Sequence, residues 1–471
     1  MLNQTLQEKY PHLEISVLKL SEVQKDNESK RIDSEFFKKE YFDAMETMQL
    51  NQVEYLGDNM KFNSRYSQPK YDETSKIKVI NSQYIRNEYI DYENAKSGYG
   101  KIVPKESVLI NATGVGTLGR VFINILDFDF SIDSHINVIV VKNKTYLNPY
   151  FLAIFLQSYY GQIQIIRYYS GTSGQIEIYP RDFNYFKIPI FPMEFQLEIQ
   201  NLVKDSHKVL EESKELYKKA EETLYLELGL DPKNPLQSLL DSKTNNPTNS
   251  PNISIHTLKE SFLKTGRLDS EYYQSKYEDI EKFIKSYPNG YDSFSSIINN
   301  KDTNFTPKNN ENYSYIELAN IGNNGNISEP ISDLGKNLPT RARRIVSKGD
   351  VIISSIEGSL SSCALITQEF DKHLVSTGFF VLNSKLLNGE TLLVMFKSQI
   401  FQEYLKKFPS GTILCAINKE ELSKILIPKI DSTTQEKIAK YIQESFNLRK
   451  KSKQLLDNAK IKVEEQIQGK I

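Results

Sequence analysis

The order of apolar and polar positions divides the chain into short alternating stretches and two long charged stretches. Short apolar runs bounded by turn residues, such as INVIVV at 136–141 and GDVIIS at 349–354, predict β-strands. Two segments of about 30 residues are instead rich in Glu and Lys and repeat apolar residues every seven positions, which predicts long helices with an apolar seam. The pattern as a whole predicts an α+β protein.

The same order of elements occurs twice. RIDSEFFKKEY at 31–41 and RLDSEYYQSKY at 267–277 share Arg, Asp, Ser, Glu and the last Tyr, and they exchange Ile for Leu and Phe for Tyr. VLINATGVGTLGRVFI and DVIISSIEGSLSSCALI come next, followed by Ser-Gly-Thr triplets at 170–172 and 410–412 and by Ile-Pro pairs before the long helices. Self-similarity on this scale indicates an internal duplication of two units of about 230 residues.

Each copy closes with one of the long helices, and the apolar seams of the two helices align at the repeat offset. In the first copy Val203, Leu210, Tyr217 and Leu224 recur every seven residues beside a parallel series. The residues predicted to line the aligned seams are Leu202, Val209, Leu216, Tyr441, Leu448 and Leu455. Two equivalent seams favour packing of the helices on each other; packing of each helix on its own domain is the alternative.

These patterns predict five segments along the chain. The boundary between the copies falls in a stretch with four prolines and five asparagines, DPKNPLQSLLDSKTNNPTNSPN, which is typical of a linker. The segments are a first domain at 1–195, a first long helix at 196–230, a linker at 231–254, a second domain at 255–430 and a second long helix at 431–469.

The repeated R-[IL]-D-S-E-[FY]-[FY] motif predicts helices over 35–48 and 271–286. We expect Asp33 and Asp269 to cap their N-termini and Phe36 and Tyr272 to pack inward. A contact of the motif with a partner protein or with the long helices is the alternative.

Gly114, Gly116 and Gly119 spell G-x-G-x-x-G after a strand-like run, as in dinucleotide-binding turns. Such a turn needs a helix after it, but period-two alternation continues through 120–141. The second copy also has Glu and two Ser in place of the glycines. We therefore predict a glycine-rich turn between strands, with positive φ or close backbone approach.

NPYF at 148–151 resembles part of the loop with which amino-methyltransferases hold a flipped base. The second proline of that loop is missing, and the second copy reads NGET at 388–391. A helix start with Asn148 as N-cap and Pro149 as its first residue is the prediction.

Composition narrows the possible functions. The formal charge of −1 excludes a uniformly basic surface, so nucleic acid would need a local patch. Cys363 and Cys415 lie 52 positions apart without histidines at ligand spacing, which excludes a zinc site or a disulfide framework and suits a reducing compartment.

The sequence has no phosphate loop, H-E-x-x-H or nucleophile elbow, so we predict no catalytic, cofactor or metal site. Without a signal peptide or an apolar membrane span, we expect a cytoplasmic protein.

Each copy has the same five features in the same order: a GDVLI-like strand, a glycine-rich turn, a Ser-Gly-Thr triplet, a proline segment with a downstream Gln196 or Gln435, and a long charged helix. This duplicated order resembles the specificity subunit of type I restriction–modification systems, and related type IIB subunits. The resemblance covers essentially the whole chain. It implies two target-recognition domains joined by two long antiparallel coiled-coil helices, each domain reading half of a bipartite, gapped DNA target. It also implies docking of two methyltransferase subunits, which would carry S-adenosylmethionine, and of endonuclease subunits using Mg²⁺ and ATP.

Candidate DNA contacts lie at corresponding places in the two copies. In the second copy a basic cluster precedes the GDVII strand, and in the first copy lysines interleaved with a tyrosine take its place. The corresponding sets are Arg341, Arg343, Arg344 and Lys348 in the second copy, and Lys96, Tyr99, Lys101 and Lys105 in the first. Arg120 after the glycine-rich turn and Arg167 near the Ser-Gly-Thr triplet are further candidates. A DNA adenine methyltransferase-like enzyme and a coiled-coil scaffold without DNA binding are the alternative functions.

Overall fold

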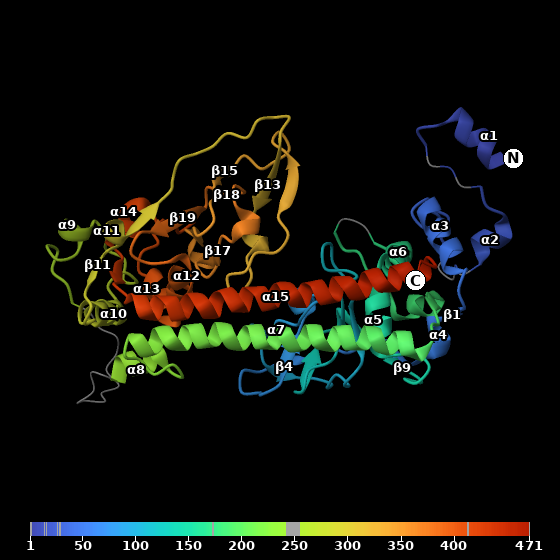
Figure 1. Cartoon of the computed structure of the whole chain (residues 1–471), viewed down its shortest axis with the longest axis horizontal. Coiled ribbons are helices and arrows are strands. Elements are labelled where there is room, and N and C mark those ends of the chain that lie inside the picture. The colour runs from blue at the N-terminus through green and yellow to red at the C-terminus, as the bar shows by residue number, and fades with distance from the viewer. Residues whose placement is uncertain are drawn as a thin grey trace. The chain divides into compact units, whose positions relative to one another are not determined.

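The computed structural model describes residues 2–13, 15, 17–25, 27, 30–171, 174–241, 255–411 and 414–470. Thr172, Thr412 and residues 242–254 of the predicted linker lie outside these ranges. The chain forms two units: Met1–Glu211 together with Arg449–Ile471, and Glu212–Leu448 (Figure 1). Each unit contains sheets, short helices and a stretch of both long helices, so the predicted α+β class is confirmed.

The first unit is built on a four-stranded antiparallel sheet of order β2-β9-β6-β7. Its strands are β2 (Met60–Arg65), β9 (Ile136–Val141), β6 (Val108–Asn111) and β7 (Val121–Ile123), and β9 has the predicted bounds. Three two-stranded pairs accompany it: β1 (Val53–Tyr55) with β10 (Lys187–Pro189), β3 (Lys70–Tyr71) with β5 (Gly98–Tyr99), and β4 (Lys78–Ile80) with β8 (Phe130–Ile132). The last pair is parallel.

Apolar side chains on opposite faces of this sheet enter two different cores. Val108 and Ile110 pack with α5 (Pro149–Gln157) and α6 (Tyr159–Tyr168), whereas Leu109 packs towards β4 and β8. Alternation along one strand therefore fills both cores. The remaining helices of this unit are α1 (Leu2–Lys9), α2 (Leu20–Gln24), α3 (Lys39–Met48), α4 (Leu56–Asn59), η1 (Ser82–Tyr84) and η2 (Pro180–Tyr185).

The second unit repeats the strand order of the first. Its main sheet has the order β12-β19-β16-β17, formed by β12 (Ile298–Asn300), β19 (Phe379–Ser384), β16 (Val351–Ser354) and β17 (Cys363–Leu365). β13 (Asn312–Ile316) pairs in parallel with β18 (Leu374–Ser376), as β4 does with β8. β14 (Ile331–Leu334) and β15 (Ala342–Ile345) extend this second sheet, and β11 (Tyr291–Ser293) pairs with β20 (Leu426–Pro428). The helices are α8 (Pro235–Asp241), α9 (Phe262–Thr265), α10 (Ser275–Lys285), α11 (Phe294–Ile297), α12 (Gly389–Lys397), α13 (Gln399–Leu405), α14 (Lys419–Lys424), η3 (Leu318–Asn320), η4 (Glu357–Ser359) and η5 (Gln368–Phe370).

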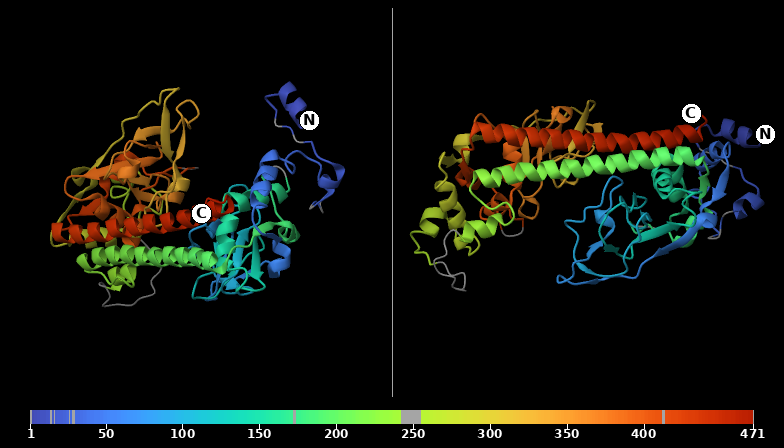
Figure 2. Two further views of the ribbon diagram at one scale, coloured as in Figure 1. Left: turned by 45° about the vertical axis from the view of Figure 1, so that its right-hand side comes forward. Right: turned by 60° about the horizontal axis from the view of Figure 1, so that its bottom comes forward.

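The long helices α7 (Met193–Glu227) and α15 (Ser432–Ile467) pair antiparallel in both units (Figures 1 and 2). In the first unit the hydroxyl of Ser206 donates to the carbonyl of Ser452 at 2.9 Å, while Lys462 pairs with Glu198 at 2.7 Å. In the second unit the hydroxyl of Ser445 donates to the carbonyl of Ser213 at 2.7 Å. Thus the end of α15 completes the first unit, and the end of α7 completes the second.

The most buried line of α7 is the series that recurs every seven residues in the sequence, one position beyond Leu202, Val209 and Leu216. Val203, Leu210, Tyr217 and Leu224 are at most 5% exposed. All six predicted seam residues are half-buried and flank the centre of the helix pair: Leu202, Val209, Leu216, Tyr441, Leu448 and Leu455.

A buried glutamine in each copy anchors the start of the long helix. The side-chain oxygen of Gln196 accepts from the backbone N–H of Asn148 at 2.8 Å, and its amide donates to the carbonyls of Tyr146 and Phe191. Gln435 repeats this arrangement, accepting from the N–H of Asn388 at 2.9 Å. The downstream glutamine of the motif is thus a structural bond between the long helix and the cap of α5 or α12.

Two predicted helices begin later than expected. Helices α3 and α10 start at Lys39 and Ser275, and the residues before them form turns. Asp33 and Asp269 cap these turns rather than the helices, accepting from the backbone N–H of Phe36 and Tyr272 at 3.2 and 3.1 Å. The reason is that each carboxylate is also held by an arginine two residues earlier, which fixes the chain in a turn.

Part of the predicted linker is helical. Helix α8 lies within 231–254, and Leu239 is 3% exposed in the core of the second unit. Burial of this leucine explains why the segment folds although it contains Pro235, which takes the first helical position.

The Arg267–Asp269 pair predicts a dependence of stability on pH. The hydrogen bonds from Arg267 hold the pKa of Asp269 below its ordinary value. A lowered folded-state pKa stabilises the fold above the unfolded-state pKa of about 3.9, and this stabilisation is lost as the pH falls through the folded-state value. The melting temperature of Asp269→Asn should therefore lie below that of the wild type at pH 7, and the difference should narrow below about pH 4 in thermal unfolding. A difference that stays constant down to pH 3 would contradict this.

Candidate nucleic-acid interface

The predicted cationic segments run beside corresponding strands in the two units. In the first unit Ile102 forms an antiparallel bridge with Ser131 of β8. In the second, β15 pairs antiparallel with β18, with Arg344 opposite Val375. Since β8 and β18 each also pair in parallel with β4 or β13, the two segments hold the same place in the fold.

The cluster of the second unit presents two exposed cations and two partly covered ones. Arg341 and Lys348 are exposed, and neither side chain has an ion pair among the described residues. Arg343 donates to the carbonyl of Thr340 at 2.8 Å and to the hydroxyl of Thr306 at 3.1 Å, which leaves the charge without a carboxylate partner. The guanidinium of Arg344 donates to the carbonyl of Phe379, and burial lowers its pKa. Arg341, Arg343 and Lys348 are therefore the side chains able to reach an anion.

The first unit offers lysines and an exposed tyrosine. Tyr99 is 53% exposed on β5, directly opposite Lys70 of β3, and Lys96, three positions earlier in the sequence, is also exposed. The ammonium of Lys101 lies 4.7 Å from the ring centres of both Phe62 and Tyr66. Lys105 forms an exposed ion pair with Asp127 at 2.9 Å, a contact that water screens. An exposed aromatic ring between cations suits stacking on a base or sugar beside a phosphate.

The glycine-rich motif is a turn between two strands, as predicted. β6 and β7 pair antiparallel on either side of it, and Gly114, Gly116 and Gly119 have φ of 91°, 81° and 82°. Arg120, at the end of the turn, donates to the carbonyl of Gly116 at 2.7 Å. The predicted helix start at Asn148 is also confirmed, since its side chain accepts from the N–H of Tyr150 and Pro149 opens α5.

Two of these glycines form a matched test of the turn. In Gly116→Ala the added Cβ would meet no atom within 4 Å, so the only cost is the left-handed backbone conformation, about 1–2 kcal/mol. Gly119→Ala also meets the side-chain oxygen of Gln162 at 2.9 Å, whose amide donates to the carbonyls of Gly119 and Leu156. We expect Gly119→Ala to lower the free energy of unfolding by about 1 kcal/mol more than Gly116→Ala in urea titrations. Equal losses would contradict this reading.

Sequence reasoning missed Arg86, which lies close to Arg120. The pKa of Arg120 is lowered, mainly by burial and to a smaller extent by the positive charge of Arg86. Arg86 donates to the carbonyls of Gln83 and Ile85. The two arginines come from positions 34 residues apart, so no local pattern could have paired them.

A second missed group surrounds Tyr179, which is 40% exposed. The guanidinium carbons of Arg65 and Arg181 lie 5.7 and 5.3 Å from its ring centre. Arg65 is held by Glu177 and by the carbonyl of Ile178, whereas the side chain of Arg181 is 61% exposed. A partly exposed tyrosine ring with two guanidinium groups over it suits stacking on a base beside a phosphate, and Arg181 is the accessible cation.

Arg167 lies inside the first unit, contrary to the predicted surface position. It is 5% exposed, with its guanidinium carbon 3.7 Å from the ring centre of Tyr41 and 4.3 Å from that of Phe36. The corresponding Lys407 lies 5.0 Å from the ring centre of Tyr272 and pairs with Glu281. This placement counts against a DNA contact by Arg167, because the aromatic cluster would have to open first. Both cations pack the repeated aromatic motif.

Comparison with known proteins finds a family model that matches part of the chain. Residues 43–222 match the family model described as Type I restriction modification DNA specificity domain. The resemblance predicted from the sequence is therefore confirmed for this part of the chain.

Proteins similar to this chain include specificity subunits of type I restriction systems. The Type I restriction enzyme HindI specificity subunit of Haemophilus influenzae is 29% identical over 129 residues, a stretch that spans 26% of this chain and 28% of that subunit. Among solved structures, the Type-I restriction-modification system S subunit from M. genitalium aligns over 89% of this chain and 95% of its own, at 13% identity and a TM-score of 0.37. The HsdS subunit from Thermoanaerobacter tengcongensis aligns over 89% and 97%, at 14% identity and a TM-score of 0.27.

The described residues show neither a membrane-spanning helix nor a metal-binding cluster. Along the described ranges, no helix is both long and apolar enough to cross a membrane. The same residues contain no group of three or more side chains arranged to hold a metal ion.

Proposed function

We propose that this chain is a DNA sequence-specificity subunit of a restriction–modification complex. The observation that carries the proposal is a pair of cationic segments, one in each unit, that run beside corresponding strands. The two units have the same strand order in their main sheets. Most of the first unit also lies within the match to a DNA specificity domain. Phosphate contacts by exposed cations position a protein on DNA, and neighbouring side chains read the bases.

On this proposal each unit reads one half of a bipartite target. The frames of the two units agree, whereas their exposed residues differ: Lys96 and Tyr99 in the first correspond to the arginine-rich segment of the second. The half-sites would therefore differ in sequence. The helices of 35 and 36 residues are about 50 Å long at 1.5 Å per residue. That length corresponds to about 15 base steps of B-DNA and would allow an unread gap between the half-sites.

The proposed subunit has no reaction of its own. Two methyltransferase subunits would dock on it and carry S-adenosylmethionine, and endonuclease subunits would use Mg²⁺ and ATP. The chain's formal charge of −1 is compatible with this division, because partners would supply part of the DNA affinity. We place the protein in the cytoplasm with these partners.

A methylation map of the host genome tests the proposal. Deleting the gene should remove N6-methyladenine from one bipartite, gapped motif while other methylated motifs stay unchanged, and restoring the gene should bring the motif back. An unchanged map in a strain with an active methyltransferase partner would contradict the proposal. Binding of S-adenosylmethionine by the isolated chain would instead support the methyltransferase alternative, and DNA-independent assembly would support the scaffold.

A further inference from the structure

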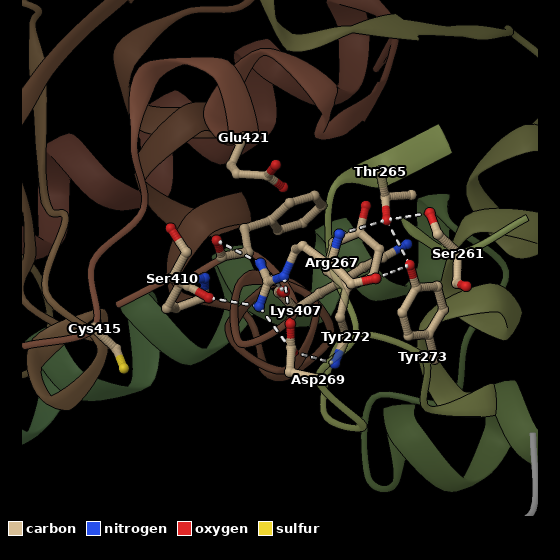
Figure 3. A network of polar contacts seen from close by, with 12 residues as sticks. Ser261, Thr265, Arg267, Asp269, Tyr272, Tyr273, Lys407, Ser410, Cys415 and Glu421 are labelled. Atoms are coloured by element: carbon tan, nitrogen blue, oxygen red, sulfur yellow. Dashed lines mark hydrogen bonds and ion pairs between the residues drawn. The ribbon is translucent and has the colours of Figure 1, made fainter. Parts of the chain in front are cut away.

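An arginine in each repeat ties the start of its domain to the C-terminal end of a distant helix. In the second unit Arg267 grips both carboxylate oxygens of Asp269, at 2.7 and 2.9 Å (Figure 3). The same guanidinium donates to the carbonyls of Lys407, Phe408 and Pro409, the last at 2.8 Å. These carbonyls lie in the segment that directly follows α13.

The first unit repeats the arrangement with different neighbours. Arg31 holds Asp33 with two bonds of 2.7 Å and donates to the carbonyls of Arg167 and Tyr169 at 3.1 and 2.7 Å. Its guanidinium carbon lies 5.1 Å from the ring centre of Phe36, as that of Arg267 lies 4.5 Å from that of Tyr272. Recurrence of the same contacts in both units shows that they belong to the repeat and are not an accident of one copy.

The described residues after the gripped carbonyls, Ser410, Gly411 and 414–417, are called the loop below, and they are bonded to the candidate interface. In the second unit Ser410 and Ala416 exchange backbone hydrogen bonds of 3.0 and 3.1 Å. Further along, Glu357 donates its N–H to Cys415 and Ile417 donates to Ser355, so the loop lies against the turn after β16.

The turn continues the connection to the cationic segment. The N–H of Ser355 donates to the carbonyl of Gly378 at 2.9 Å, and Thr377 donates to the carbonyl of Arg341 at 2.9 Å. In the first unit Ile178 donates to Ala112, and Ala112 donates to His135, which follows β8, the strand bridged to Ile102 of the cationic segment. A shift of the loop would therefore be passed through backbone bonds to the edge that carries Arg341.

We propose that Arg31 and Arg267 are positioning residues, each of which sets the geometry of the DNA-reading edge of its own unit. The inference rests on the proposed function and deepens it, since it assigns half-site specificity to residues that do not touch DNA. Arginine is required because its planar fork holds a carboxylate with two nitrogens while still donating to carbonyls; lysine offers a single point charge.

The two cysteines of the chain allow a test without DNA. Cys415 lies in the loop and is partly exposed, its thiol donating to the carbonyl of Gly411 at 3.2 Å. Cys363 is fully buried in the sheet, and burial raises the pKa of its thiol to about 12. Alkylation of Cys415 should therefore report the loop, and alkylation of Cys363 should report unfolding of the unit.

In Arg267→Ala and Arg267→Lys we expect iodoacetamide to alkylate Cys415 about tenfold faster than in the wild type, because the guanidinium bonds no longer hold the backbone at 407–409 that precedes Cys415. Alkylation of Cys363 should stay slow. Arg31→Ala, the matched change in the other unit, should leave Cys415 unaffected. An unchanged rate at Cys415 in Arg267→Ala, or a parallel rise at Cys363, would overturn the positioning role.

Methylation mapping separates this inference from the proposed function. Arg267→Ala should relax the sequence requirement in one half of the gapped motif and keep the other half strict; Arg31→Ala should do the reverse. A merely structural loss would lower methylation at every site without changing the motif. If the wild type directs no gapped motif, the proposed function fails. If it does and both variants keep the full motif, only the positioning role fails.

Discussion

Replacing Arg341, Arg343 and Lys348 together by alanine is expected to weaken DNA binding about a hundredfold at 0.15 M salt, because three phosphate contacts and their released counterions are lost. These three cations extend from the segment that pairs with β18, and none has a carboxylate partner among the described residues. Binding should be measured with the chain assembled with its methyltransferase subunits, on a duplex carrying the mapped motif. Arg344 is left intact because its guanidinium supports the fold through Phe379.

The salt dependence and a charge-matched control make this result specific. The slope of log affinity against log salt should become shallower by about 2 to 3 in the triple variant. Alanine at Lys282, Lys285 and Lys429 removes the same charge from the same unit, on elements outside the candidate interface. If the control weakens binding as much as the triple variant, a general loss of charge explains the effect and the assigned surface is wrong.

Leu456→Ala, near the C-terminus of the sequence, is expected to destabilise the first unit, and Leu224→Ala is expected to destabilise the second. Leu456 is 6% exposed and belongs to the core formed by α5, α6 and the N-terminal part of α7. Leu224 is fully buried in the core that holds α12 and α13. Removal of a buried leucine side chain costs about 2–5 kcal/mol, the larger values arising where the cavity cannot collapse.

Hydrogen exchange read by mass spectrometry resolves which unit responds. In Leu456→Ala the protection of peptides from 100–170 should fall while peptides from 340–410 keep theirs, and in Leu224→Ala the order should reverse. Leu226→Ala and Ile461→Ala lie on the same helices but are 66% and 51% exposed, so they should change protection little. Loss of protection confined to the unit nearest in sequence would refute the assignment of the helix ends.

Much of the fold was predictable because it depends on neighbours within a few residues. The alternation at 136–141 predicted β9, the Asn148-Pro149 pair predicted a capped helix, and the comparison of copies identified the glycine-rich motif as a turn. The starts of α3 and α10 were misplaced because Asp33 and Asp269 are held by arginines, a competing local bond that a capping rule does not include.

The candidate site was predictable only in part. The cationic segments could be found because basic residues gather within ten positions, and their correspondence followed from the repeat. Two other features join residues that are distant in sequence, so no local pattern indicated them. Arg86 lies close to Arg120, and the guanidinium groups of Arg65 and Arg181 lie over the ring of Tyr179. Arg167 has the same charge as the exposed candidates, and only its aromatic surroundings distinguish it.

The sequence by itself determined the duplication, the α+β class, the long helices and the two basic segments, because periodicity and local charge are properties of consecutive residues. The tertiary structure alone decided that the end of each long helix completes the unit of the other copy, that Arg167 is buried, and that Arg31 reaches the carbonyl of Tyr169 across 138 positions. The physical reason is that burial and hydrogen-bond partners depend on which distant surfaces meet, and that is settled by packing of the whole unit.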